Sequence, residues 1–184
     1  MRKLIIGLFT AVLFLTGCSH VATGEKKPAD MSGYVTYDEQ TEYVFDETTV
    51  EEVLKRIDNG DDFAVYFGFA ACPFCNQAMP VLNEVATDMQ QRVDYIDVRS
   101  DASWKSNTDI DSYDLLIERI GYMFEEDADG VPHMYVPFVL FVHDGEFVLN
   151  HTGVTEDYEV GNDITPAQRD ELADIYIEGF EGIQ

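Results

Sequence analysis

The sequence predicts an α/β fold, and three observations support this prediction. Segments with strand-like and helix-like hydrophobic patterns alternate along most of the chain. An apolar run of strand length leads directly into a Cys-x-x-Cys motif and a helix-like segment. Asp144-Gly145 separates two strand-like segments, which is the signal of a β-hairpin. At 184 residues, with 46% hydrophobic and 26% charged residues, the chain has the size and composition of one globular domain.

The first half of the domain alternates strands with helices. Thr48 and Thr49 each precede a glutamate by three residues, so two overlapping capping boxes start the first helix, and Asn59-Gly60 ends it. Pro80 falls inside the apolar pattern of the second helix, where it should kink the helix. The expected elements are a strand over 42–45, a helix over 50–59, a buried strand over 63–69, a helix after Cys75 and a strand over 92–98.

The second half adds a helix, a hairpin and a terminal helix. Thr165, Pro166 and Gln168 form a strong helix start, with Thr at the cap, Pro at the first position and Gln three residues after the cap. The expected elements are a helix over 113–124, an acidic break over 125–130, a strand over 138–143, its hairpin partner over 146–150 and a helix from 165 onward. Residues 99–110 and 152–164 are expected to be loops.

The first 18 residues have the pattern of a bacterial export signal. Arg2 and Lys3 form a positive start, and the apolar segment from Leu4 to Leu15 is too short to span a bilayer as a lasting helix. Leu15-Thr16-Gly17-Cys18 resembles the lipobox of bacterial lipoproteins, which implies cleavage before Cys18 and lipid attachment to its sulfur. An ordinary signal peptide with an incidental cysteine is the alternative.

This N-terminal pattern predicts where the protein is located and how it is attached to the membrane. We expect a lipoprotein signal peptide over residues 1–17 and an extracytoplasmic protein anchored at the cell membrane through lipid on Cys18. Residues 19–40 carry Ser, Thr, Gly, Lys, Pro and Asp without hydrophobic periodicity. We therefore expect a lipid-anchored, flexible linker over residues 18–41 and a folded domain over residues 42–184.

The charge balance limits the choice of partners. The formal net charge is −25 and the isoelectric point is near 4.1. Nucleic-acid binding needs basic patches, so this class of partner is excluded, and anionic lipid surfaces should repel the protein. An acidic, solubilising surface on an exported protein accounts for the charge.

The cysteine count leaves one pair. The chain has three cysteines, and lipid on Cys18 would leave only Cys72 and Cys75. A helix N-terminus favours a thiolate over a thiol, because its backbone N–H groups are unpaired and its dipole end is positive. We expect reduced Cys72 to titrate below about pH 7.5, against about 8.5 for an ordinary thiol.

Four features together resemble the thioredoxin superfamily over about residues 42–184. They are Cys72-Pro73-Phe74-Cys75 after a hydrophobic strand, Pro80, Val136-Pro137 leading a strand, and the Asp144-Gly145 hairpin. With the lipobox, the chain is similar to the exported thioredoxin-like lipoproteins of Gram-positive bacteria, among which the bacteriocin-transport accessory family is the nearest group. The resemblance implies a thioredoxin-like three-layer α/β/α sandwich with a mixed sheet.

The resemblance also implies roles for the motif residues. Cys72 would be the exposed attacking thiolate, and Cys75 would be the more buried resolving thiol. Pro73 and Phe74, between the two cysteines, belong to the expected substrate-binding residues. Thiol–disulfide exchange needs such an attacker, a second thiol that releases the mixed disulfide, and access for a partner.

Across the sheet, the resemblance implies a cis-proline at Pro137. Val136 would then offer backbone groups to an extended substrate chain, so Val136 and Pro137 complete the expected substrate-binding set. Pro132 is the rival candidate, but the buried strand begins immediately after Pro137.

Three departures from the family pattern stand out. Tyr66 occupies the position where many thioredoxins keep a buried Asp, and with a pKa of about 10 it is a poor substitute as a base. Ala71 replaces the Trp often found before the first cysteine. The interval from Cys72 to Pro137 is longer than in compact thioredoxins, so we expect an insertion over about residues 99–130 near the active face.

The leading hypothesis is a membrane-tethered, extracytoplasmic thiol–disulfide oxidoreductase acting on protein cysteines. The redox-active Cys72–Cys75 disulfide serves in place of a cofactor, and the expected partners are thiols or disulfides of proteins and peptides, together with a membrane redox partner. The motif leaves open whether the protein oxidises or reduces its clients. A non-catalytic accessory module for bacteriocin export or immunity, which holds cationic peptides on an acidic face, is the alternative.

Other readings of the motifs remain as alternatives. The dithiol could be a merely structural disulfide. His133, His143 and His151 lack the short paired spacing of a zinc site, so we expect no metal there. The run ending in Gly130 faintly resembles a calcium loop, but Val136 stands where a bidentate Glu is needed.

Overall fold

The computed structural model of the protein describes residues 26–100 and 112–184. The expected signal peptide, Cys18 and residues 101–111 of the expected insertion lie outside these residues. Within the two described ranges, no helix is long and apolar enough to cross a membrane. The elements are β1 (Phe45–Glu47), α1 (Val50–Asn59), β2 (Phe63–Gly68), α2 (Pro73–Asp88), β3 (Val93–Asp97), α4 (Ser112–Ile120), η1 (Gly121–Met123), β4 (Glu125–Glu126), β5 (Pro132–His133), β6 (Phe138–His143), β7 (Glu146–Thr152) and α5 (Pro166–Gly182).

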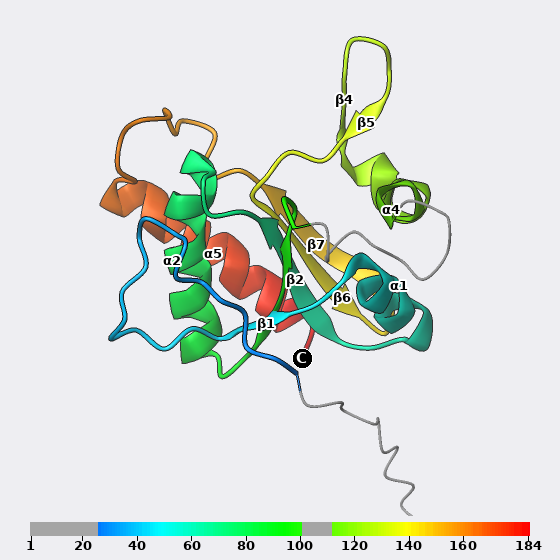
Figure 1. Cartoon of the computed structure of the whole chain (residues 1–184), viewed down its shortest axis with the longest axis horizontal. Coiled ribbons are helices and arrows are strands. Elements are labelled where there is room, and N and C mark those ends of the chain that lie inside the picture. The colour runs from blue at the N-terminus through cyan, green and yellow to red at the C-terminus, as the bar shows by residue number, and fades with distance from the viewer. Residues whose placement is uncertain (1–25, 101–111) are drawn as a thin grey trace, which may run out of the picture.

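The main sheet is mixed and has the strand order β1-β3-β2-β6-β7. β1, β3 and β2 are parallel, β6 is antiparallel to β2, and β7 is the hairpin partner of β6. α2 and α5 cover one face, and α1 and α4 cover the other (Figure 1). The expected thioredoxin-like three-layer α/β/α sandwich is therefore confirmed.

β2 is the central strand, and all six of its residues are buried. Tyr66 faces the core under α2 and α5, whereas Val65 and Phe67 face the core under α1 and α4. A strand covered on both faces needs apolar residues at every position, which explains the continuous apolar run. The carboxyl end of β2 leads directly to the Cys-x-x-Cys motif.

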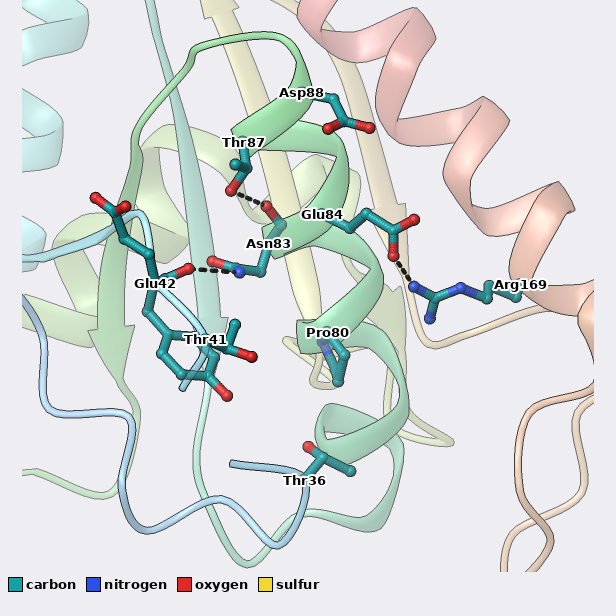
Figure 2. A pocket seen from close by; sticks show the side chains of 10 residues that line it. Thr36, Thr41, Glu42, Pro80, Asn83, Glu84, Thr87, Asp88 and Arg169 are labelled. Atoms are coloured by element: carbon teal, nitrogen blue, oxygen red, sulfur yellow. Dashed lines mark hydrogen bonds and ion pairs between the residues drawn. The ribbon is translucent and has the colours of Figure 1, made fainter. Parts of the chain in front are cut away.

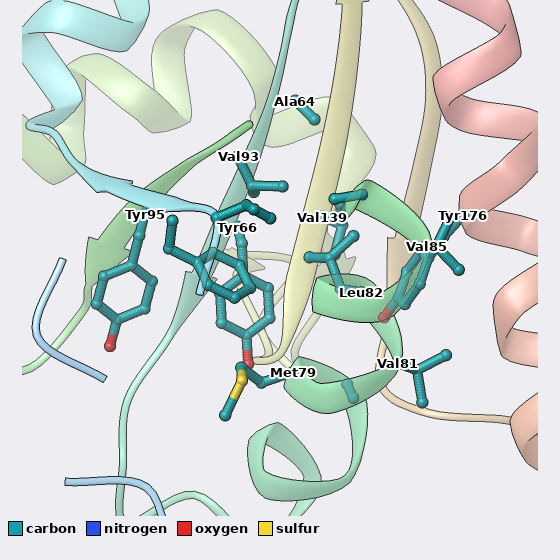
Figure 3. Close-up of a cluster of buried hydrophobic side chains, with 14 of the residues drawn as sticks. Ala64, Tyr66, Met79, Val81, Leu82, Val85, Val93, Tyr95, Val139 and Tyr176 are labelled. Carbon is teal, nitrogen blue, oxygen red and sulfur yellow. The ribbon is translucent and has the colours of Figure 1, made fainter. Parts of the chain in front are cut away.

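The core between the sheet and α2 holds the helix in place. Met79 and Leu82 of α2 point toward Tyr66 and Val139 of the sheet, and all four are fully buried (Figure 3). Burying each side chain of this size stabilises the fold by about 1.5–3 kcal/mol. Pro80 lies inside α2, as predicted.

The helix starts follow the capping predictions with one difference. α1 begins after Thr49, whose hydroxyl accepts the N–H of Glu52 at 3.2 Å, while Glu52 accepts the N–H of Thr49. The second expected box does not form, because Thr48 lies outside the helix and donates instead to the Glu52 carboxylate. The box at Thr165 forms as expected.

A two-stranded ribbon, β4–β5, replaces the expected acidic break. The carboxylate of Asp127 accepts the N–H groups of Asp129 and Val131, each at 2.9 Å, and lies 2.8 Å from His133 Nε2. The Val131 amide, followed by His133, lowers the pKa of Asp127. Strands of two residues show no alternation, so the hydrophobic pattern could not reveal them.

Residues 26–44, here called the strap, pack against the domain, which corrects the part of the expected linker that lies within the described residues, 26–41. Met31 and Tyr34 are buried, at 2% and 4% exposure. Hydrogen bonds from the Ala29 N–H to the Phe45 carbonyl and from the Glu47 N–H to the Lys27 carbonyl join the strap to β1. Only a few large side chains anchor the strap and it has no regular structure, so periodicity could not predict it.

The start of the strap is also held by charge. Asp94 on β3 is buried, and its carboxylate pairs with Lys26 of the strap and with Arg56 of α1. A buried carboxylate needs such partners, because an unpaired charge in the core is strongly destabilising. From residue 26 onward the strap is therefore part of the folded unit.

A substitution at Met31 tests this correction. Met31→Ala should lower the free energy of unfolding by about 2–4 kcal/mol, because it leaves a cavity in the core. Val35→Ala, in the same strap but 88% exposed, should change it by less than about 0.5 kcal/mol. Urea unfolding followed by circular dichroism measures both. Equal and negligible effects would mean that the strap is a tether after all.

Candidate redox site

The dithiol lies where the sequence placed it. Cys72 is the N-cap of α2, Pro73 occupies its first turn, and Cys75 follows within that turn. Cys72 and Cys75 form a disulfide with a Cα–Cα distance of 5.1 Å. Cys72 is only 4% exposed, although we expected an exposed sulfur, because it is bonded to Cys75 and contacts the Val136 carbonyl.

The Cys72 sulfur occupies the cap position of the helix. Sγ of Cys72 accepts the backbone N–H of Cys75 at 3.1 Å. The first turn of α2 contains no acidic side chain that would oppose a negative charge. On reduction, the helix N-terminus and this N–H would both stabilise a thiolate on Cys72.

The start of β6 lies against the dithiol. The Val136-Pro137 peptide bond is cis, as expected, whereas the rival Pro132 lies in the β4–β5 ribbon. The Val136 carbonyl oxygen lies 3.6 Å from Sγ of Cys72. Pro137 is buried and Val136 is half-buried, so the structure brings together the dithiol and the expected backbone contact point.

An acidic loop, residues 153–164, lies beside the first turn of α2 (orange in Figure 1). Tyr158 packs edge-on against Phe74 with ring centroids 5.3 Å apart. Gln77 of α2 accepts the N–H of Ile164, and the Pro137 carbonyl accepts the N–H of Gly153. Sequence reasoning missed Tyr158 as a site residue, because nothing in a loop pattern shows which helix it touches.

Asn76 is a second residue that sequence reasoning missed. Its side chain is buried and hydrogen-bonds to the active-site turn and to the strap. A polar residue on the apolar face of a predicted helix was the only available signal.

Tyr66 stands where many thioredoxins keep a buried acid. Its hydroxyl donates to the Cys75 carbonyl at 3.4 Å. Burial, followed by the neighbouring Tyr176, raises the pKa of Tyr66 well above its usual value. Tyr66 therefore stays protonated near neutral pH, so it can donate a hydrogen bond behind Cys75 but cannot act as a base. Gly68 makes room for its ring, because a Cβ there would lie 2.8 Å from the Tyr66 hydroxyl.

Two further tyrosines complete a buried cluster behind Cys75. The Tyr34 hydroxyl donates to the Tyr95 hydroxyl at 3.2 Å, and the ring of Tyr95 stacks on Tyr66 with centroids 5.9 Å apart. Burial is the largest cause that raises the pKa of Tyr34 and of Tyr95, and it alone raises that of Tyr176. The strap thus supplies one member of the cluster.

Among the described residues, one group could offer three ligand atoms to a metal ion. These atoms, from Asp62, His143 and Asp144, lie within 4.8 Å of one another. The group is at the β6–β7 turn, at the opposite end of β2 from the dithiol. The other two histidines of the described residues lie elsewhere: His133 pairs with Asp127, and His151 bonds to the Val154 carbonyl.

Comparison with known proteins gives structural likeness only. No family model matches the sequence, and no curated protein matches it. Thioredoxin O2 from Arabidopsis thaliana is 17% identical, with a TM-score of 0.42 over 61% of this chain and 85% of its own. Desulfothioredoxin from Desulfovibrio vulgaris Hildenborough is 17% identical, with a TM-score of 0.42 over 71% of this chain and 93% of its own. Values this low carry no inference about activity.

The tyrosine cluster predicts alkaline sensitivity. Tyr34, Tyr66, Tyr95 and Tyr176 have raised pKa values in the folded state, so the folded protein holds their protons more tightly than the unfolded chain does. The stability they confer is full below about pH 10, where the unfolded chain titrates, and falls above it by up to about 1.4 kcal/mol per tyrosine and pH unit.

Absorbance at 295 nm and circular dichroism, recorded together during an alkaline titration, measure this effect. We expect the tyrosinate signal of these four residues to appear only as the fold is lost. Ionisation of Tyr66 near pH 10 in a still-folded protein, revealed by the difference from Tyr66→Phe, would contradict it.

Proposed function

We propose that the protein is a membrane-tethered, extracytoplasmic thiol–disulfide oxidoreductase that acts on protein cysteines through Cys72 and Cys75. One observation carries the proposal: the sulfur of Cys72 lies at the N-terminus of α2, accepts the Cys75 N–H, and contacts the Val136 carbonyl. A purely structural disulfide has no need of a helix N-terminus or of a backbone carbonyl held against one sulfur.

The exchange proceeds in two steps. In the reducing direction, the Cys72 thiolate attacks one sulfur of a client disulfide; the client S–S bond breaks, a Cys72–client disulfide forms, and the released client thiolate takes up a proton. Cys75, as a thiolate, then attacks the Cys72 sulfur; the Cys72–client bond breaks, and the second client sulfur leaves as a thiolate that takes up a proton from solvent. Two electrons and two protons pass to the client, and the Cys72–Cys75 disulfide is formed. The oxidising direction is the same sequence in reverse.

The substrate would lie against the start of β6. Val136 offers a backbone carbonyl beside the reacting sulfur. Pro73 is exposed and Phe74 is half-buried, so both lie at the surface of the motif. Phe74 is held by Tyr158, so its ring presents a fixed apolar contact. These are the residues that would position an extended client chain.

The direction of exchange depends on how strongly the Cys72 thiolate is stabilised relative to the disulfide. A reduction potential of about −120 mV would mark an oxidant of clients, and one of about −270 mV would mark a reductant. Because Tyr66 cannot act as a base, the proton of Cys75 must leave by another route, which disfavours fast reduction of clients. A membrane redox partner would restore the starting state after each cycle.

The location in this proposal rests on the N-terminal sequence. The apolar segment and the Leu15-Thr16-Gly17-Cys18 box support export, cleavage and lipid attachment at Cys18. Export to an oxidising compartment also agrees with a chain whose remaining two cysteines are paired. The resemblance of the motifs to those of the bacteriocin-transport accessory family suggests bacteriocin export as a biological setting.

Single cysteine variants test the proposed roles. Cys75→Ser should accumulate a stable mixed disulfide with a peptide that contains one internal disulfide, because no resolving thiol is left. Cys72→Ser, the matched control, should accumulate little or none. Non-reducing mass spectrometry with peptide mapping reads out the linked cysteine. If both variants accumulated equal amounts of mixed disulfide, the prediction that Cys72 is the attacking thiol would be wrong.

A second candidate function is a non-catalytic module that binds cationic peptides. The acidic loop favours it, since residues 153–164 carry four acidic residues and no basic ones, and Tyr158 holds the loop against the site. Electrostatic attraction of this kind would accelerate encounter with basic partners.

A double variant separates the two functions. Cys72→Ser with Cys75→Ser should abolish disulfide exchange while leaving the binding of a cysteine-free, lysine-rich peptide unchanged, measured by fluorescence anisotropy. If cells carrying this variant keep full biological function, the oxidoreductase proposal is wrong and the binding module stands.

A further inference from the structure

α2 carries two buried asparagines seven residues apart on the face that meets the strap. Asn76 is 6% exposed and Asn83 is 5% exposed. Seven residues are about two helical turns, so the two side chains lie on the same face. A buried amide must have hydrogen-bond partners, and in both cases the strap backbone supplies the donor to the side-chain oxygen.

Asn83 holds the far end of the strap. Its Oδ1 accepts the N–H of Val44 at 3.0 Å, and its Nδ2 donates to the Glu42 carbonyl at 3.0 Å. Figure 2 shows this second bond, with Thr36 of the strap lying near the first turns of the helix. A cavity of about 390 Å³ lies between the strap and α2. Asn83 makes no contact with the dithiol.

Asn76 holds the near end of the strap. Its Oδ1 accepts the N–H of Val35 at 2.7 Å. Its backbone carbonyl accepts the Thr36 hydroxyl at 3.1 Å. The strap is therefore fixed to α2 at two points, each time through an asparagine side-chain oxygen that accepts a strap N–H.

Only Asn76 also reaches the active site. Its Nδ2 donates to the Ala70 carbonyl at 2.7 Å and to the Cys72 carbonyl at 2.8 Å. The Cys72 N–H in turn bonds to the Phe69 carbonyl. These bonds fix the turn between β2 and α2, which determines where the Cys72 side chain points.

We propose that Asn76 is a positioning residue that couples the strap to the active-site turn and so sets the stability of the Cys72 thiolate. This inference rests on the proposed function in one respect, that Cys72 is the attacking thiol. Without the Asn76 amide, the Ala70 carbonyl loses its partner, and the turn is freer to move. Sγ of Cys72 then spends less time against the Cys75 N–H, which destabilises the thiolate.

The experiment measures the rate of iodoacetamide alkylation of Cys72 against pH in the reduced, full-length protein, resolved by peptide mapping. In the wild type the midpoint should lie below about pH 7.5. Asn76→Ala should raise it by at least about 0.5 unit, because a hydrogen-bonded arrangement that favours the charged form is weakened. Asn83→Ala is the matched control: it should lower the melting temperature to a similar degree and leave the midpoint unchanged.

Two further variants separate the contacts of Asn76. Asn76→Asp keeps an acceptor for the Val35 N–H but turns an oxygen toward the Ala70 and Cys72 carbonyls, so it should raise the midpoint at least as much as Asn76→Ala. Thr36→Val changes only the exposed strap, so it remains informative if an Asn76 variant does not fold. It should raise the midpoint by less than Asn76→Ala, whereas Thr41→Val should not move it.

The outcomes are distinct. Equal shifts in Asn76→Ala and Asn83→Ala would mean that general loosening, rather than positioning, moves the midpoint. No shift in Asn76→Ala, or none in Thr36→Val, would overturn the coupling. The alkylation measurement needs no client. If the protein failed to exchange disulfides with any peptide, the proposed function would be overturned, but the comparison of the alkylation midpoints would still test the coupling.

Discussion

The hydrogen bond from the Cys75 N–H to the sulfur of Cys72 is the contact on which the rest of the site depends. It exists only while the first turn of α2 keeps its place at the end of β2. The central strand is buried on both faces, and the buried side chains of Met79 and Leu82 pack α2 against the sheet. The Asn76 amide then fixes the turn between strand and helix. Packing places the helix, and polar contacts place the sulfur.

The polar environment behind the dithiol differs from the arrangement implied by family resemblance. A buried carboxylate could exchange a proton with the resolving thiol, but Tyr66 holds its proton too tightly to do so. The tyrosines instead form a mostly apolar wall in which only hydroxyl groups are polar. Burial of aromatic rings stabilises this side of the core. The site therefore combines a sulfur in a thiolate-favouring position with a tyrosine hydroxyl, rather than a carboxylate, against the Cys75 carbonyl.

Most of the fold could be predicted from local patterns, and the failures have physical causes. The run around Val65 and the capping boxes act over a few residues, so the sequence displays them directly. The Cys-x-x-Cys motif spans four consecutive residues and is visible in the sequence, whereas Pro137 was identified as its distant partner only through the family resemblance. The strap was misjudged because Met31 and Tyr34 are isolated anchors without periodicity. Asn76 and Tyr158 were missed because their importance lies in contacts between segments far apart in sequence, which no local pattern encodes.

The packed strap limits how far the domain can extend from an anchor. If Cys18 carries lipid, only seven residues separate it from Lys26, where the described domain begins. Even fully extended, that connection spans at most about 29 Å, whereas a free linker to residue 41 would reach about 80 Å. The protein would then reach only substrates at or close to the membrane surface, and it would not reach substrates farther from the membrane.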